Sequence, residues 1–123
     1  MRDTVDGPAF PVGLERAAEL ALERKAGEVT GMDLRGISSA TDAFLLATGT
    51  SDIQVKAIAE HVIDELKKDG ARPRHVEGLQ EGRWVLIDYF DFVVHVFHTD
   101  ARAFYQLEVL WGDAPVRHFD DGV

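Results

Sequence analysis

Residues 84–98 constrain the fold more than any other part of the chain. They read Trp-Val-Leu-Ile-Asp-Tyr-Phe-Asp-Phe-Val-Val-His-Val-Phe-His. Two apolar runs flank a short acidic turn around Tyr89 and Phe90, and this pattern predicts a hairpin of strands 83–88 and 91–98. Large aromatic side chains beside carboxylates at strand ends indicate a recognition surface rather than a catalytic one.

The rest of the chain predicts alternating helices and strands. We expect a helix over residues 12–26 that Gly27 stops, strands over 28–35 and 43–47, an edge strand over 73–76 and a last helix that Thr99 caps. The run 43–47 is continuously apolar, as in a strand that is covered on both faces.

The clearest helix opens at Ser51. Ser51 and Gln54 fit a capping box, with Gln54 reaching back to the cap amide, and Gly70 ends the helix in a left-handed conformation. Its apolar stripe comprises Ile53, Ala57, Ile58, Val62 and Leu66, widened by Val55 and Ile63.

These elements predict one α/β domain with a mixed sheet of about five strands flanked by helices. Its 123 residues suit a single domain. We place the domain at residues 12–115, after a loose lead-in over 1–11 and before a frayed C-terminal tail over 116–123.

Composition excludes several classes of function. The formal net charge is -9, so the surface repels nucleic acid backbones and anionic lipid, and neither direct DNA binding nor membrane binding is expected. Cysteine is absent, which removes disulfides and thiolate chemistry. No apolar run suits a membrane span or a secretory signal, so a cytoplasmic protein is expected.

Three groups of residues carry side chains that could support chemistry. Asp88 and Asp91 lie three residues apart at the hairpin turn, where a shared magnesium ion is not favoured. The loop 48–51 precedes a helix but lacks a phosphate-binding fingerprint. His95 and His98 fall on opposite faces of their strand, so they cannot share one metal ion. His95 is expected to pack in the fold with one ring nitrogen satisfied by backbone or a carboxylate. Neither a cofactor nor a metal is expected.

Several blocks together resemble the ribosomal silencing factor family, also called Iojap-like. They include residues 39–44 (Ser-Ala-Thr-Asp-Ala-Phe), 47–51 (Ala-Thr-Gly-Thr-Ser) and 84–89 (Trp-Val-Leu-Ile-Asp-Tyr). The others are 32–35, 54–59, 76–78, 91–97 and 104–115. The blocks occur in family order over nearly the whole chain.

The resemblance implies a fold related to nucleotidyltransferases, without enzymatic activity. It implies binding to the fourteenth protein of the large ribosomal subunit, on the intersubunit face, which would block small-subunit joining and repress translation. Homodimers and a role in large-subunit assembly are also implied.

Carried over to this chain, the partner-binding surface centres on four residues of the hairpin, with two more beside it: Trp84, Asp88, Tyr89 and Asp91, then Glu77 and His95. Two positions depart from the family pattern. Ala43 stands where an aromatic residue is common, and Phe90 stands where the turn is usually small or polar.

The sequence is compatible with two other functions. One is a magnesium-dependent, nucleotidyltransferase-like enzyme that uses Asp88 or Asp91 with the loop 49–51. The other is a large-subunit assembly factor that uses the same docking surface.

Overall fold

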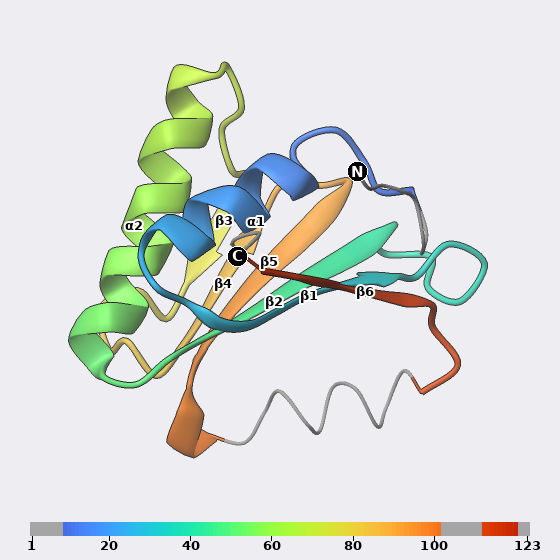
Figure 1. The fold of residues 1–123 in the computed structure, drawn as a ribbon. Helices are drawn as coiled ribbons and strands as arrows, with labels where there is room; N and C mark the ends of the chain where they lie inside the picture. The colour runs from blue at the N-terminus through green and yellow to red at the C-terminus, as the bar shows by residue number, and fades with distance from the viewer. Residues whose placement is uncertain (1–8, 102–111, 121–123) are drawn as a thin grey trace.

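The computed structural model describes residues 9–101 and 112–120 and contains a six-stranded mixed sheet (Figure 1). The strands lie in the order β3-β4-β5-β2-β1-β6, with β2 and β5 parallel and the other neighbours antiparallel. In chain order the elements are α1 (Leu14–Glu23), β1 (Gly27–Asp33), β2 (Ala43–Gly49), α2 (Asp52–Lys68), β3 (His75–Glu77), β4 (Trp84–Asp88), β5 (Phe92–His98), a 3-10 turn (Thr99–Ala101) and β6 (Val116–Phe119). The predicted single α/β domain with a mixed sheet is confirmed.

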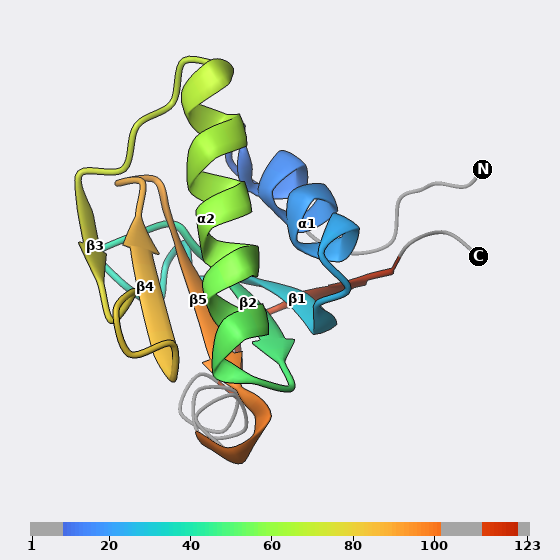
Figure 2. The ribbon, with the colours of Figure 1, turned by 90° about the vertical axis from the view of Figure 1, so that its left-hand side faces the viewer.

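Both helices cover the same face of the sheet (Figure 2). The main core lies between them and alternate residues of the central strands, such as Leu45 of β2 and Val94 of β5. Leu14 of α1 and Ile58 of α2 are fully buried in it. The apolar stripes of the two amphipathic helices are therefore buried against the sheet.

The opposite face carries a second, smaller cluster of buried residues. Met32, Leu46 and Phe97 are completely buried there, with Leu34 and Ala114 beside them. Because side chains alternate along a strand, β2 contributes Leu45 to one face and Leu46 to the other. The prediction that this strand is covered on both faces is confirmed.

The predicted C-terminal tail is wrong, because residues 116–119 form β6. This strand pairs antiparallel with β1, with Val29 opposite Phe119 and Met32 opposite Val116. The ring of Phe119 lies 6.3 Å from that of Phe10, so part of the predicted lead-in also packs on the sheet. A strand of four residues carries too little alternation to be recognised before its neighbour is known.

The helix ends agree with the sequence in part. Gly70 has φ +95 and ends α2 as predicted, but α1 ends through Lys25, at φ 67, while Gly27 begins β1. Ser51 accepts a hydrogen bond from the Gln54 amide at 3.0 Å. The Gln54 side chain accepts from the amide of Thr50 rather than from the cap amide.

Two further predictions concern the ends of α2 and β5. Ile53, predicted to lie in the buried stripe of α2, is 81% exposed. At about 3.6 residues per turn it lies on the opposite side of the helix from the buried residues Val55 and Val62, so its place in the stripe was wrong. Thr99 begins a 3-10 turn, and the rest of the predicted last helix lies outside the described residues. Within the described part of the chain, neither helix is long and apolar enough to cross a bilayer.

Candidate functional site

Four of the predicted partner-binding residues share the face of the sheet that α1 and α2 leave uncovered. The register places Glu77 opposite Leu86, and Leu86 opposite His95, in one row across β3, β4 and β5. Since side chains two residues apart share a face, Trp84 and Asp88 lie on the same side as Leu86. We call Glu77, Trp84, Asp88 and His95 the sheet-face cluster.

Trp84 is the large aromatic side chain of this cluster. It is 44% exposed, and its ring centroid lies 5.2 Å from that of the buried Phe97. Its indole N–H donates a hydrogen bond of 3.0 Å to Nδ1 of His95. Trp84 is therefore half in solvent and half packed, with its polar atom bonded within the protein.

His95 is itself buried, with 4% of its surface exposed. Its ring stacks on Phe97 at 6° and meets Phe44 edge-on with the centroids 4.5 Å apart. Burial lowers the pKa of His95 from 6.5 to about 4, because the charged ring loses its hydration. The prediction of a packed histidine is confirmed, but the expected partner was wrong, because its bonded nitrogen accepts from the Trp84 indole rather than contacting backbone or a carboxylate.

Asp88 is already engaged within the hairpin. Its carboxylate accepts from Arg74 Nε at 3.0 Å and from the Phe90 amide at 2.8 Å. The Arg74 guanidinium also lies over the Phe90 ring, 4.7 Å from its centroid. These contacts hold Phe90 at φ 76, a conformation that costs a bulky residue about 1–3 kcal/mol, with its side chain 61% exposed.

Tyr89 points to the other side of the sheet. It packs against the main core and stacks on Phe92, with the ring centroids 5.1 Å apart. Burial raises its pKa to about 12, and its hydroxyl oxygen has no hydrogen-bond partner in the described residues. Asp91, two residues further along the turn, is exposed and is accessible to a partner. The buried Tyr89 hydroxyl is not accessible.

Sequence reasoning missed Gly78, which shapes the loop before Trp84. Its φ is +80, and a Cβ at this position would lie 2.0 Å from the Trp84 carbonyl oxygen. Only glycine permits this approach of the two backbone segments. Gly78 belongs to one of the blocks that carry the family resemblance, but its contact with Trp84 is visible only in three dimensions.

The residues of the proposed enzymatic site do not come together. Asp88 lies opposite Val93 near the start of β5, whereas Gly49 lies opposite His98 at the end of that strand. The seven residues from Ala43 to Gly49 span about 20 Å from end to end at the usual rise per residue. The loop 49–51 and the hairpin carboxylates therefore lie at opposite ends of the central strands, too far apart to hold one metal ion together.

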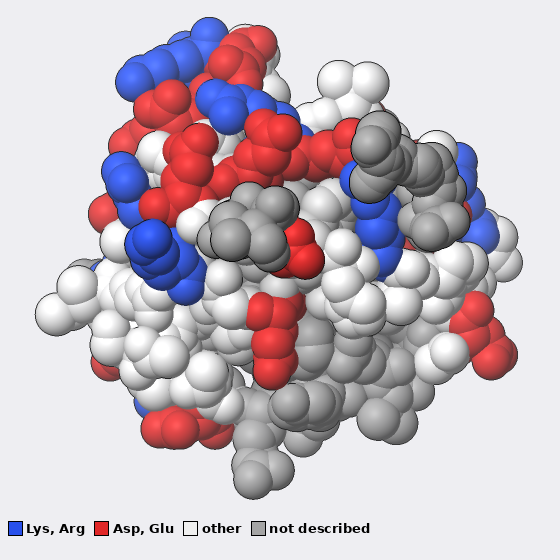
Figure 3. Space-filling model, viewed as in Figure 1, with Lys and Arg blue, Asp and Glu red and all other residues white. Residues whose placement is uncertain are grey.

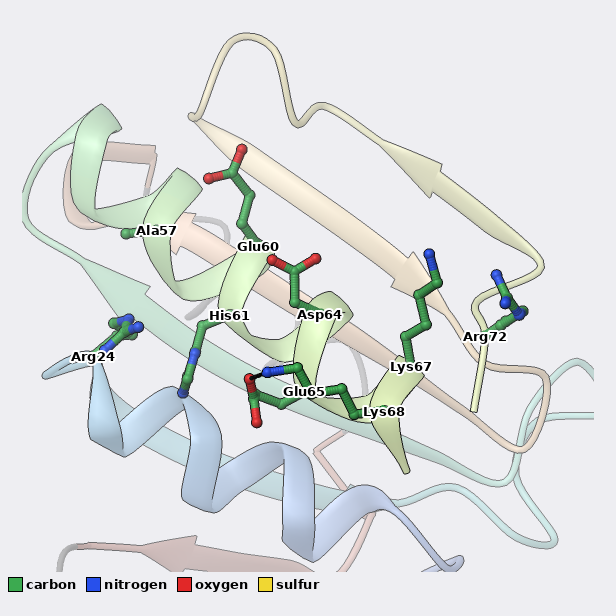
Figure 4. Close-up of a pocket in the computed structure, with 9 residues that line it drawn as sticks. All are labelled: Arg24, Ala57, Glu60, His61, Asp64, Glu65, Lys67, Lys68 and Arg72. Atoms are coloured by element: carbon green, nitrogen blue, oxygen red, sulfur yellow. Dashed lines mark hydrogen bonds and ion pairs between the residues drawn. The ribbon is translucent and has the colours of Figure 1, made fainter. Parts of the chain in front are cut away.

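A groove of about 780 Å³ runs along α2 on the opposite side of the molecule from the sheet-face cluster (Figure 4). It is lined by Arg24, Ala57, Glu60, His61, Asp64, Glu65, Lys67, Lys68 and Arg72. Charged side chains of both signs gather over α1 and α2 (Figure 3). Several are paired, including Lys68 with Glu65 at 2.9 Å and His61 with Glu23 at 2.7 Å. Because the lining carries both positive and negative side chains, it favours neither an anionic nor a cationic ligand. In the residues that the structure describes, no cluster of metal-ligating side chains occurs.

The family model described as "Ribosomal silencing factor during starvation" matches residues 9–122. A ribosomal silencing factor of Bacillus subtilis is 44% identical over 110 residues, which cover 89% of this chain and 93% of that protein. One from Halalkalibacterium halodurans is 45% identical over 102 residues, covering 83% and 87%. The chloroplastic Iojap protein of Zea mays is 31% identical over 112 residues, which cover 91% of this chain and 47% of that protein.

Two crystal structures share the fold. One, from Bacillus halodurans, has a TM-score of 0.74 at 43% identity and covers 80% of this chain and 91% of its own. The other, from Chromobacterium violaceum, has a TM-score of 0.75 at 36% identity and covers 80% and 83%. The family model, the relatives and the shared fold agree with the motifs along the sequence: this chain belongs to the ribosomal silencing factor family.

Proposed function

We propose that this protein docks on the fourteenth protein of the large ribosomal subunit and sterically blocks the small subunit from joining. Membership of the family supports a role in repressing translation during starvation. The bacterial relatives are named as ribosomal silencing factors. The contact surface comprises Glu77, Trp84 and Asp88 of the sheet-face cluster together with the exposed Asp91 at the hairpin turn, and the buried His95 lies beneath Trp84.

The observation that carries this proposal is Trp84, held half-exposed on the sheet face that the two helices leave uncovered. Interfaces draw much of their binding energy from a few such aromatic side chains, which bury large area at small entropic cost. Trp84 is already fixed by His95 and Phe97, so docking would freeze few additional rotamers.

Charge favours a protein partner over RNA. The net charge of -9 opposes binding to phosphate backbones but suits a basic ribosomal protein. Asp91 adds an exposed carboxylate at the edge of the same surface. Charges at the rim of an interface chiefly steer association and set its specificity.

Sedimentation of mixed ribosomal subunits tests the proposal. Purified large and small subunits would be run on a sucrose gradient with and without this protein. We expect the joined peak to decrease and the protein to travel with the large subunit. Unchanged joining without co-sedimentation would refute the proposal, and co-sedimentation with unchanged joining would favour the assembly role instead.

The variant Trp84→Ala tests the contact surface. We expect binding to the large subunit to weaken by about 2 kcal/mol, or about 30-fold, as for an interfacial anchor. Ile53→Ala is the matched control, because it removes an exposed apolar side chain from α2 and should bind normally. Thermal unfolding followed by circular dichroism must show that both variants are folded. Normal binding by a folded Trp84→Ala protein would show that Trp84 is not the anchor.

A further inference from the structure

The hydrogen bond between Trp84 and His95 fixes the state of both rings. An indole N–H can only donate, so Nδ1 of His95 must accept at 3.0 Å. The neutral imidazole then carries its proton on Nε2. The indole in turn has no second polar atom, and the remainder of its surface is apolar.

The surroundings of His95 exclude direct contact with a partner. The ring is enclosed by Trp84, Phe44 and Phe97, and its Nε2 atom is buried without a hydrogen-bond partner in the described residues. A buried donor without a hydrogen-bond partner destabilises the folded protein, so a histidine at this position lowers stability. Leucine or phenylalanine would pack at this position without that cost. The hydrogen bond that Nδ1 accepts from the Trp84 indole therefore explains why a histidine occupies this position.

We infer that His95 is a positioning residue, which holds Trp84 against the sheet by accepting its indole N–H and so leaves only the apolar ring for a partner. This inference rests on the proposed docking role of Trp84. It changes the expected chemistry of the interface, because the pocket that receives Trp84 needs to be apolar and needs no acceptor for the indole nitrogen. It also changes the expected role of His95, from a contact residue to one that acts through Trp84.

Two variants separate the acceptor from the packing. His95→Asn keeps an oxygen acceptor near the place of Nδ1, whereas His95→Leu fills a similar volume with no acceptor. The first readout needs no ribosome. The chain has two tryptophans, so a nitrogen-15 correlation spectrum contains two indole signals, and Trp84→Phe assigns the one from Trp84.

We expect the Trp84 indole proton to exchange with solvent at least about tenfold faster in His95→Leu than in the wild type, and at a near-normal rate in His95→Asn. Unchanged exchange in a folded His95→Leu protein would show that the hydrogen bond does not hold the indole. This result stands whether or not the protein binds ribosomes.

The second readout is co-sedimentation with the large subunit. We expect His95→Leu to weaken binding about fivefold, the effect of one ordinary hydrogen bond, and His95→Asn to stay within about twofold of the wild type. Faster indole exchange with unchanged binding would overturn the positioning role. If the wild type itself fails to bind, the proposed function is refuted, while the exchange result still decides whether His95 holds Trp84.

Discussion

Acid should destabilise this fold through His95. In the folded protein burial holds the pKa of His95 at about 4, whereas the unfolded chain has the ordinary value near 6.5. Below about pH 6.5 His95 therefore becomes protonated in the unfolded chain but stays neutral in the folded protein. The stability that the neutral ring contributes is complete above that pH and is lost as the pH falls toward 4.

The magnitude follows from the two pKa values. About one pH unit below the unfolded value, the imbalance in proton binding changes the unfolding equilibrium about tenfold, or about 1.4 kcal/mol. Urea unfolding between about pH 8 and about pH 5.5 would measure this loss. That range stays above the isoelectric point near 4.9, where a protein of low net charge tends to precipitate.

His95→Asn is the control, because asparagine does not titrate and keeps an acceptor for Trp84. The quantity to plot is the difference in unfolding free energy between wild type and variant at each pH, since the other titrating groups cancel in it. We expect this difference to fall by about 1.4 kcal/mol from pH 8 to 5.5. A flat difference would show that His95 is protonated as easily in the folded protein as in the unfolded chain, and the argument from burial would be wrong.

Three further predictions concern stability. Gly78→Ala should lower the free energy of urea unfolding by about 3 kcal/mol, because its Cβ would collide with the Trp84 carbonyl. The control Gly70→Ala, in open space at φ +95, should lower it by only about 1 kcal/mol. Equal losses for the two variants would contradict the collision. Tyr89→Phe should leave the melting temperature unchanged or raise it, since it removes a buried hydroxyl with no partner in the described residues; a clear drop would reveal a hydrogen bond. A chain that ends at residue 115 should be at least about 2 kcal/mol less stable to unfolding than one that ends at residue 120. The shorter chain lacks the pairing of β6 with β1 and the packing of Phe119. Equal melting temperatures for the two chains would show that β6 adds no stability.

The sequence predicted the parts of this fold that depend on local pattern. Alternation over residues 84–98 predicted β4, the turn and β5, and it placed His95 and His98 on opposite faces. The cap at Ser51 and the left-handed Gly70 depend on a few neighbouring residues, and both are confirmed. Strand and helix periods are properties of the backbone, so they can be recognised without knowing what packs against them.

Candidate site residues were placed less well, because their environment depends on other strands. Periodicity could not show that Asp88 is engaged by Arg74, fourteen residues away, or that Tyr89 turns into the main core. The four residues of β6 became a strand only through pairing with β1.

The sequence by itself therefore determined the fold class, the hairpin and the family to which the chain belongs. Only the tertiary structure decided which side chains of the hairpin remain available to a partner. The register of β4 on β5 brings the Trp84 indole to His95, eleven residues away along the chain. Trp84 remains half-exposed on the sheet, whereas His95 is buried beneath it. A register is set by the packing of the whole sheet, since a slip of one residue would exchange its two faces.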